Sequence, residues 1–197
     1  MTYTVLRESL IPCNVDIKQV LRYAGAHDSG EGIKELVDDC IKKLENNYTF
    51  NVCYTKVPLS INGTACNFGA FSVNSASLSK HLRSCDSAVI FAATIGLSAD
   101  RIISKYSKTS PSHAVILDAV CTERIEALCD VFCEKLSHSH KTTRRFSAGY
   151  GDVPLEVQKD IFALLDCHKN IGLTLNDSLI MSPSKSVTAI VGINSKE

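Results

Sequence analysis

The sequence contains no tryptophan, only two methionines and no excess of charge of either sign. Its 21 lysine and arginine residues balance 21 aspartate and glutamate residues, which gives a formal net charge of zero at pH 7. Binding to nucleic acid depends on an excess of cationic side chains over an extended face. Because the basic residues here are dispersed along the chain, the composition argues against a nucleic-acid partner.

Long apolar stretches are also missing. The longest, Ala88 to Ile95, is far shorter than the roughly 20 residues that a membrane-spanning helix requires. The N-terminal segment Met1 to Ile11 contains Arg7 and Glu8 and lacks the apolar region of a secretory signal. We therefore expect a soluble cytoplasmic protein that does not act at a membrane.

Cysteine, in contrast, is frequent. Nine cysteines without an export signal or the tight spacing of a disulfide scaffold indicate reduced thiols. Cys121, Cys129 and Cys133 could share one stripe of a helix, but metal sites usually pair cysteines through C-x-x-C loops. We interpret the stripe as core and the pair His138 and His140 as solvated, so no metal site is expected.

The overall composition is that of a folded chain. Of the 197 residues, 45% are hydrophobic, which is enough apolar surface to offset the conformational entropy lost on folding. No internal repeat, low-complexity tract or linker divides the sequence. We expect one domain spanning residues 1–197.

Two helices are expected near the N-terminus. Asn14 can cap the first, whose apolar positions follow helical spacing as far as Gly25. The polar loop His27 to Gly32 follows. Apolar residues over 33–44 then recur at steps of three and four, which is typical of an amphipathic helix.

The middle of the chain predicts strands. Residues 48–54 alternate between apolar and polar, which is typical of a half-buried strand. The dipeptide Asn62-Gly63 favours a tight turn and therefore a meander of short antiparallel strands, after which Ser75 or Ser77 could begin a short helix. Ala88 to Ile95 is apolar on both faces, which indicates a central strand covered on two sides.

The longest helical pattern runs from Ser112 to about His138. A shorter helix precedes it, for which Ser98 or Asp100 could provide the cap. Downstream, Asp152 could cap a last helix, and two strands are expected over 171–180 and 186–193. These elements predict an α+β fold in which a mixed or antiparallel central sheet is flanked by helices, one of them long and central.

The loop after the long helix is the most informative stretch. Arg145 stands four and five residues before Gly149 and Tyr150. An arginine can bind a carboxylate through two parallel hydrogen bonds, glycine permits positive φ or close approach of a ligand, and the main chain around Ser147 could contact it. The residues alone leave two interpretations open: a ligand-binding loop, or a turn in which Arg145 pairs with a surface acid and Asp152 caps a helix.

The run Asp166 to Gly172 is close to the D-x-H-x-x-G motif of cobalamin-binding modules. Its glycine comes one residue late, and Asp166 ends a helical pattern instead of following a strand. We interpret His168 as a helix-end residue, favoured there by the helix dipole. No corrin site is expected within this chain.

The run Arg145-x-Ser147-x-Gly149-Tyr150 resembles the R-x-A/S-x-G-Y loop of the S-adenosylmethionine-binding activation domain of cobalamin-dependent methionine synthase. Downstream, residues 175–183 and 186–188 are similar to that family's L-T-E-S-x-x-M-x-P segment and to the S-V-S strand after it. Three further runs, at 20–23, 92–96 and 117–119, resemble short free-standing members of the family. The resemblance covers most of the chain.

The resemblance implies a methionine synthase activation domain-like fold and a set of ligand contacts. Arg145 would bind the carboxylate of S-adenosylmethionine, and Ser147, Gly149 and Tyr150 would surround the ligand. A helix glutamate of the family also faces the ligand, and Glu126 is its best match here. The alternative is Glu123, one turn away. The family's acidic contact from an N-terminal arm has no residue assigned in this sequence.

The resemblance also implies a function. In the family, this domain presents S-adenosylmethionine to an inactive cob(II)alamin, which gains one electron and the methyl group and becomes methylcobalamin. The work of the domain is positional, so no catalytic acid or base is nominated. We expect a free-standing reactivation module, the component of a split cobalamin-dependent methionine synthase, a methyltransferase of methionine biosynthesis.

The expected cofactor is S-adenosylmethionine, with cobalamin only on the partner protein. The expected partners are a cobalamin-binding methionine synthase subunit and a flavodoxin-like or ferredoxin-like reductant. The alternative is a non-catalytic docking protein that recognises a corrinoid protein and binds no small molecule. An unrelated Rossmann-type methyltransferase is disfavoured, because no glycine-rich loop follows an early strand.

Overall fold

The computed structural model describes residues 3–26 and 30–195, so part of the expected loop at 27–32 lies outside the described residues. Among the described residues, a five-stranded antiparallel sheet has the order β1-β2-β6-β10-β7. Its strands are β1 (Leu6–Ser9), β2 (Asn51–Pro58), β6 (Ser87–Thr94), β10 (Ser186–Asn194) and β7 (Lys141–Thr142). The predicted apolar strand is therefore β6, at the centre of the sheet.

Two smaller antiparallel sheets accompany the main one. The first is a three-stranded meander of β3 (Ser60–Asn62), β4 (Ala65–Asn67) and β5 (Ser72–Asn74). It confirms the predicted meander, and Asn62-Gly63 forms the turn between β3 and β4. The second is a hairpin of β8 (Thr174–Leu175) and β9 (Met181–Ser182).

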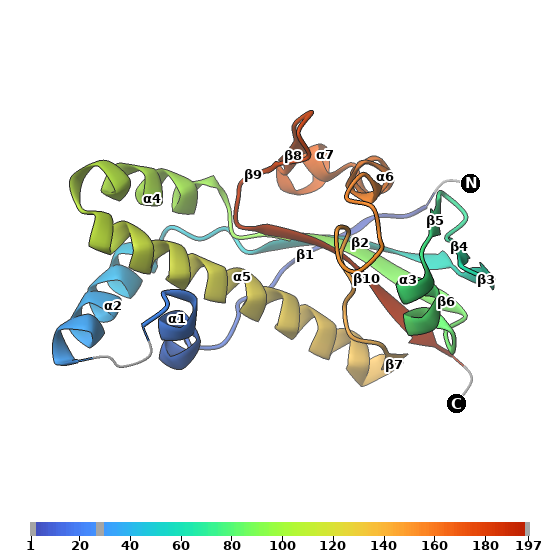
Figure 1. Cartoon of the computed structure of the whole chain (residues 1–197), viewed down its shortest axis with the longest axis horizontal. Helices are drawn as coiled ribbons and strands as arrows, with labels where there is room; N and C mark the ends of the chain where they lie inside the picture. Colours follow the sequence, from blue (N-terminus) through green and yellow to red (C-terminus); the bar gives the residue numbers. More distant parts are fainter. Residues whose placement is uncertain (1–2, 27–29, 196–197) are drawn as a thin grey trace.

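Helices cover both faces of the main sheet, and Figure 1 shows α5 on one side with α6 and α7 on the other. The first face packs against α1 (Ile17–Tyr23), α2 (Glu31–Leu44), α4 (Leu97–Thr109) and α5 (Pro111–Ser139). The second face packs against α3 (Ala76–Leu82), α6 (Val157–Leu165) and α7 (Cys167–Ile171). The predicted α+β class and the long central helix, α5, are confirmed.

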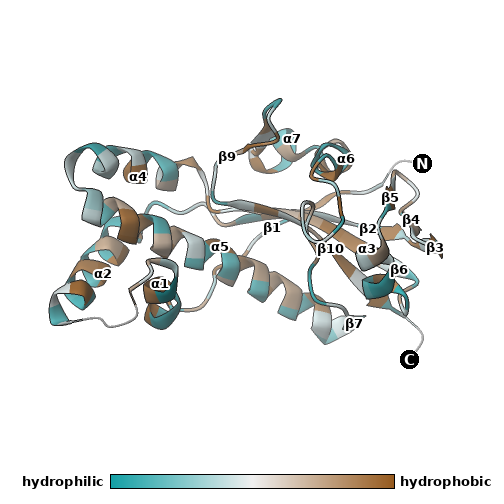
Figure 2. Ribbon diagram, viewed as in Figure 1, coloured by the Kyte–Doolittle hydropathy of each residue, from teal (hydrophilic) through white to brown (hydrophobic). Residues whose placement is uncertain are grey.

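Alternate residues of each strand supply the two cores. In β6, Phe91 faces α5, whereas its neighbours Ile90 and Ala92 belong to the core on the other face. The ring of Phe132, in the C-terminal half of α5, lies 4.8 Å from that of Phe91 and 5.0 Å from that of Tyr54 in β2. Figure 2 shows the brown apolar residues concentrated on the strands and the inward faces of the helices.

The expected strand over 48–54 is displaced in the structure. The strand β2 begins only at Asn51, and Val52 and Cys53 are both buried although they point to opposite faces. The prediction of a half-buried strand is wrong, because β2 lies between β1 and β6 with helices on both sides.

Two predicted helix caps are also wrong. The cap of α1 is Asp16, not Asn14: the Asp16 carboxylate accepts hydrogen bonds from the backbone N–H groups of Lys18 and Gln19, at 2.9 and 3.3 Å. The helix α4 begins directly after Gly96, so the candidate caps lie inside it. One of them, Asp100, instead accepts two hydrogen bonds from Ser184, because the loop before β10 packs onto this helix end.

The C-terminal segment 171–180 was expected to be a strand, and this prediction is wrong. A short helix, α7, ends at Gly172 with φ +68°, and only Thr174 and Leu175 pair with another strand. The Asn176 carboxamide oxygen accepts a hydrogen bond from the Ile180 N–H at 2.9 Å and closes a turn. Local side-chain bonding of this kind competes with strand pairing.

The prediction that Asp152 caps α6 is wrong as well. This carboxylate lies at the N-terminus of α3, where it accepts hydrogen bonds from the backbone N–H groups of Ala76 and Ser77, at 2.7 and 3.1 Å. It also accepts one from the hydroxyl of Ser75, the cap of α3. The helix α6 begins at Val157, five residues after Asp152, too far along the chain for local capping. Asp152 therefore fixes the 149–152 turn to α3.

We expect this contact to make stability depend on pH. The hydrogen bond from Ser75 is the main reason that the pKa of Asp152 falls to about 2, whereas an aspartate in an unfolded chain titrates near about 3.9. Ionised Asp152 therefore stabilises the fold fully above about pH 4, and this contribution is lost as the pH falls through about 2. Asp152→Asn should lower the free energy of unfolding near neutral pH, and its deficit should disappear toward about pH 2.

Urea unfolding between about pH 6 and about pH 3 measures that deficit. The matched control is Asp177→Asn, because Asp177 is an exposed carboxylate of the β8–β9 turn and should give the same stability as wild type at each pH. A deficit of Asp152→Asn that stays constant with pH would contradict the assignment.

Candidate functional site

Arg145 lies where the chain crosses from β7 along the edge of β10. The next residue, Phe146, exchanges two backbone hydrogen bonds with Ile190 of β10, and its ring belongs to the core on the α3 and α6 side. Because successive side chains of an extended segment point to opposite faces, Arg145 points toward α5. There its Nη1 donates to Asp130 Oδ1 at 2.5 Å, and its Nη2 donates to Glu126. We call these three residues the Arg145 clamp.

The clamp is partly buried and strongly charged. The side chains of Arg145, Glu126 and Asp130 are 24%, 38% and 72% exposed. Burial opposes the guanidinium charge, but the hydrogen bond to Asp130 and the adjacent carboxylate of Glu126 hold the pKa of Arg145 above its ordinary value. One permanent cation therefore faces two carboxylates, of which Asp130 is the most open to solvent.

The clamp lies at a cavity of about 580 Å³ between α5, α1 and the segment before α1. This volume falls in the range of small-molecule sites, about 300–1,000 Å³. The lining has five carboxylates but only two guanidinium groups, so its field favours a cationic ligand. The charged residues are Asp16, Arg22, Glu123, Glu126, Asp130, Glu134 and Arg145.

A buried ion pair holds the α1 side of this cavity in place. Glu123 and Arg124 are each 5% exposed, and their side chains form two hydrogen bonds of 2.5 and 2.7 Å. Arg124 Nη1 also donates to the Cys13 carbonyl at 2.5 Å, and Glu123 accepts a hydrogen bond from the backbone N–H of Asp16 at 3.2 Å. The pair therefore attaches residues 13–16 to α5.

The other residues implied by the resemblance lie elsewhere. Ser147, Gly149 and Tyr150 are not among the residues that line the cavity. The expected positive φ is found at Gly149, +80°, whose N–H donates to the Val153 carbonyl at 3.0 Å. Tyr150 is 69% exposed, and its ring stands edge-on to that of Phe146 with 5.2 Å between centroids.

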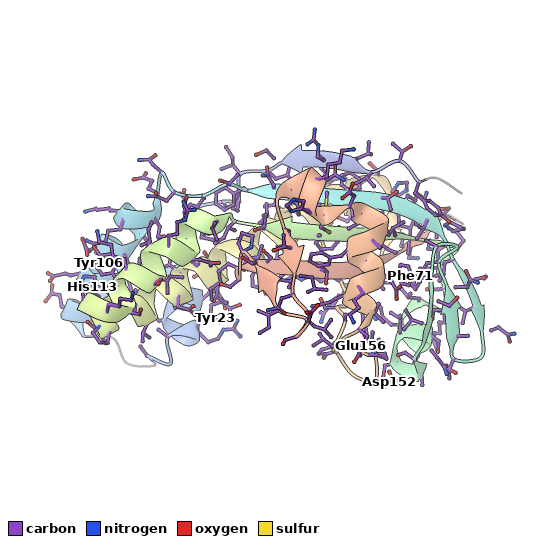
Figure 3. All side chains as sticks on the ribbon, turned by 90° about the horizontal axis from the view of Figure 1, so that it is seen from above. Tyr23, Phe71, Tyr106, His113, Asp152 and Glu156 are labelled. Atoms are coloured by element: carbon purple, nitrogen blue, oxygen red, sulfur yellow. The ribbon has the colours of Figure 1, made fainter. Side chains whose placement is uncertain are left out.

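Figure 3 shows that α1 and the 149–152 turn lie in different halves of the molecule. Tyr23, on α1, lies in the half that contains α2 and α4, whereas Asp152, which ends the turn at 149–152, lies in the other half. The structure therefore brings Arg145 together with Glu126 and leaves the glycine turn outside the cavity. Both interpretations of the loop are partly realised: Arg145 pairs with acids, and it also lines a cavity.

Four charged residues of the cavity were not identified from the sequence: Asp16, Arg22, Asp130 and Glu134. Asp130 follows Glu126 by four residues, and this spacing on a predicted helix places both on one face, so it could have been found. Asp16 and Arg22 reach the cavity only because α1 packs on α5. No local pattern indicates that pairing.

The cysteine stripe of α5 lies in the core. Cys121 and Cys129 are fully buried, and Cys133 packs against the same apolar cluster. Burial raises the pKa of all three thiols. Within residues 3–26 and 30–195, no group of three or more His, Cys, Asp or Glu side chains has an arrangement that could hold a metal ion.

Residues 75–196 match the family model described as "Vitamin B12 dependent methionine synthase, activation domain". This chain belongs to that family. The matched segment contains the Arg145 clamp and the 147–150 loop, whereas α1 lies before it.

Among solved structures, the activation-domain chain is similar to one described as "Crystal Structure of the MetH Reactivation Domain bound to AdoHcy". The TM-score is 0.70 at 15% sequence identity, and the match covers 100% of this chain and 80% of that one. At this identity the likeness establishes the fold. The search of curated proteins finds no match.

Proposed function

We propose that residues 1–197 act as one activation domain that binds S-adenosylmethionine in the cavity between α1 and α5. The single observation that carries the proposal is the position of Arg145 and Glu126 in one cavity of a chain of this family. The similar MetH structure was solved with AdoHcy, the molecule that remains when S-adenosylmethionine has given up its methyl group.

The charges of the cavity fit this ligand. S-adenosylmethionine carries an ammonium, a sulfonium and one carboxylate, so it is a net cation, as the acidic lining requires. Glu126 faces the cationic part, and Arg145 binds the carboxylate. Asp16, which lines the same cavity from the segment before α1, supplies the acidic contact of the N-terminal arm. Ser147, Gly149 and Tyr150 lie outside this cavity, and we propose them as contacts only for a part of the ligand that extends out of it past Arg145.

We further propose that the domain acts in trans as a reactivation module of a split methionine synthase. It presents the methyl group to cob(II)alamin on a separate cobalamin-binding subunit, while a flavodoxin-like or ferredoxin-like protein supplies the electron. The residues of this chain bind and orient the ligand, and proximity is their contribution to the rate. Among the described residues, no helix combines the length and apolarity needed to cross a membrane.

A reconstituted methyl transfer tests this proposal. The chain is mixed with S-adenosylmethionine, a chemical reductant and a cobalamin-loaded methionine synthase fragment that lacks its own activation domain. We expect the absorbance of cob(II)alamin to convert to that of methylcobalamin only when the chain is present. Conversion at the same rate without the chain, together with no calorimetric binding of millimolar S-adenosylmethionine, would refute it.

The ion pairs of the clamp predict how Asp130 affects the affinity for S-adenosylmethionine. Arg145 Nη1 donates to Asp130, so a ligand carboxylate that binds at this nitrogen must replace Asp130. Because Asp130 is 72% exposed, breaking this ion pair costs only about 0.5–1 kcal/mol. Asp130→Asn should therefore bind S-adenosylmethionine about two- to fivefold more tightly than wild type in calorimetric titration. Weaker binding would mean that Asp130 positions Arg145 instead of competing with the ligand.

A second candidate function is favoured by the same ion pairs. Both terminal nitrogens of Arg145 already have carboxylate partners, as expected of a structural residue in a docking protein that binds no small molecule. Capture of a cobalamin-loaded synthase separates the two functions. Capture that is unaffected by S-adenosylmethionine and by Arg145→Ala supports docking alone, whereas dependence on both supports the activation function.

A further inference from the structure

The cavity contains a second guanidinium group, supplied by α1. Arg22 lines it together with Arg145, but the two arginines differ in their contacts. Arg145 has two carboxylate partners. Arg22 is exposed and has no ion pair with any carboxylate of the described residues. Arg22 is therefore the cation of this cavity that is not neutralised.

The contact that Arg22 does make leaves its donors available. Its guanidinium carbon lies 4.7 Å from the centroid of the Tyr23 ring, and the face of an aromatic ring offers the guanidinium no oxygen acceptor. The N–H groups of a guanidinium lie in its plane and point outward, in the geometry that matches a carboxylate. Figure 3 shows Tyr23 on α1. The ring thus contacts the guanidinium without giving it a carboxylate partner.

We propose that Arg22 is a second binding residue for the carboxylate of S-adenosylmethionine; this rests on the proposed function of the cavity. The clamp has one cation and two carboxylates, so it repels an approaching anion until Asp130 leaves. Arg22 imposes no such barrier and makes the first contact. A carboxylate has two oxygens and about four acceptor sites, which is enough for donors from both arginines that line the cavity. Arg22 lies outside the segment that matches the family model.

The experiment pairs one substitution with two ligands. Calorimetric titration compares wild type and Arg22→Gln with S-adenosylmethionine and with its decarboxylated analogue, which keeps the sulfonium and the amine but lacks the carboxylate. We expect Arg22→Gln to weaken binding of S-adenosylmethionine about tenfold or more. Binding of the decarboxylated analogue should stay unchanged or tighten, because a positive charge has been removed from the site.

The matched control is Lys18→Gln, which removes one positive charge from the same helix at a residue that does not line the cavity. It should change the affinity for either ligand less than about twofold, because exposed charges at a distance are screened. Urea unfolding of Arg22→Gln should match wild type, since the side chain is exposed.

The outcomes separate the inference from the function. If wild type binds S-adenosylmethionine and Arg22→Gln binds both ligands as wild type does, or loses affinity for both equally, the role of Arg22 is refuted and the proposed function stands. If wild type binds neither ligand, the proposed function fails and the inference fails with it. Loss of affinity confined to the ligand with the carboxylate confirms the assignment.

Discussion

Arg145→Ala should abolish S-adenosylmethionine binding at concentrations that saturate the wild-type chain, with a loss of affinity on the order of 100-fold. Two effects add. The ligand carboxylate loses a partner that can donate two parallel hydrogen bonds. Glu126 and Asp130 also lose the cation that neutralises them, so two unpaired carboxylates repel the anionic end of the ligand. Calorimetric titration of both proteins measures the difference.

The neighbouring arginine provides the control for this experiment. Arg144 is exposed, has the same charge and does not line the cavity, so Arg144→Ala should bind like wild type. Equal affinity of Arg145→Ala and Arg144→Ala would show that the guanidinium of the clamp does not hold the ligand. The function would then have to be sought in docking.

The fold could be predicted where one residue pattern extends over many positions. The apolar strand β6 and the helix α5 agree with the sequence to within a residue or two, because burial on two faces and helical spacing repeat along each. The predictions of the helix caps were wrong for the opposite reason. A cap depends on one side chain, and that side chain can accept hydrogen bonds from a distant segment instead. Asp100 accepts them from Ser184, and Asp152 accepts them from the N-terminus of α3.

The candidate site follows the same rule. The resemblance to the family identified both Arg145 and Glu126, and the two are in contact. That Arg145 points to α5 could not be read from its motif, since it depends on the pairing of Phe146 with β10. The contributions of Asp16 and Arg22 depend on how α1 packs on α5, and two residues of α5 bind the segment just before α1.

Those two residues, Glu123 and Arg124, are the subject of the largest expected effect on stability. Arg124→Met should lower the free energy of unfolding by about 3–5 kcal/mol, because it leaves the Glu123 carboxylate buried without its counter-ion. It also removes the hydrogen bond to the Cys13 carbonyl, so the segment before α1 should detach from α5 first. Urea unfolding measures the total, and hydrogen exchange of residues 13–23 measures the local loss.

Two variants show whether the uncompensated charge is the cause. In Glu123→Gln with Arg124→Met neither charge remains, so this double variant should be more stable than Arg124→Met alone. Lys135→Met breaks the ion pair with Glu8, in which the lysine side chain is 55% exposed, and should cost less than about 1 kcal/mol. If Arg124→Met costs no more than Lys135→Met, the buried pair does not hold α1 against α5. If its cost is as large as expected, the side of the cavity that carries Asp16 and Arg22 depends on this pair, and ligand affinity should fall in the same variant.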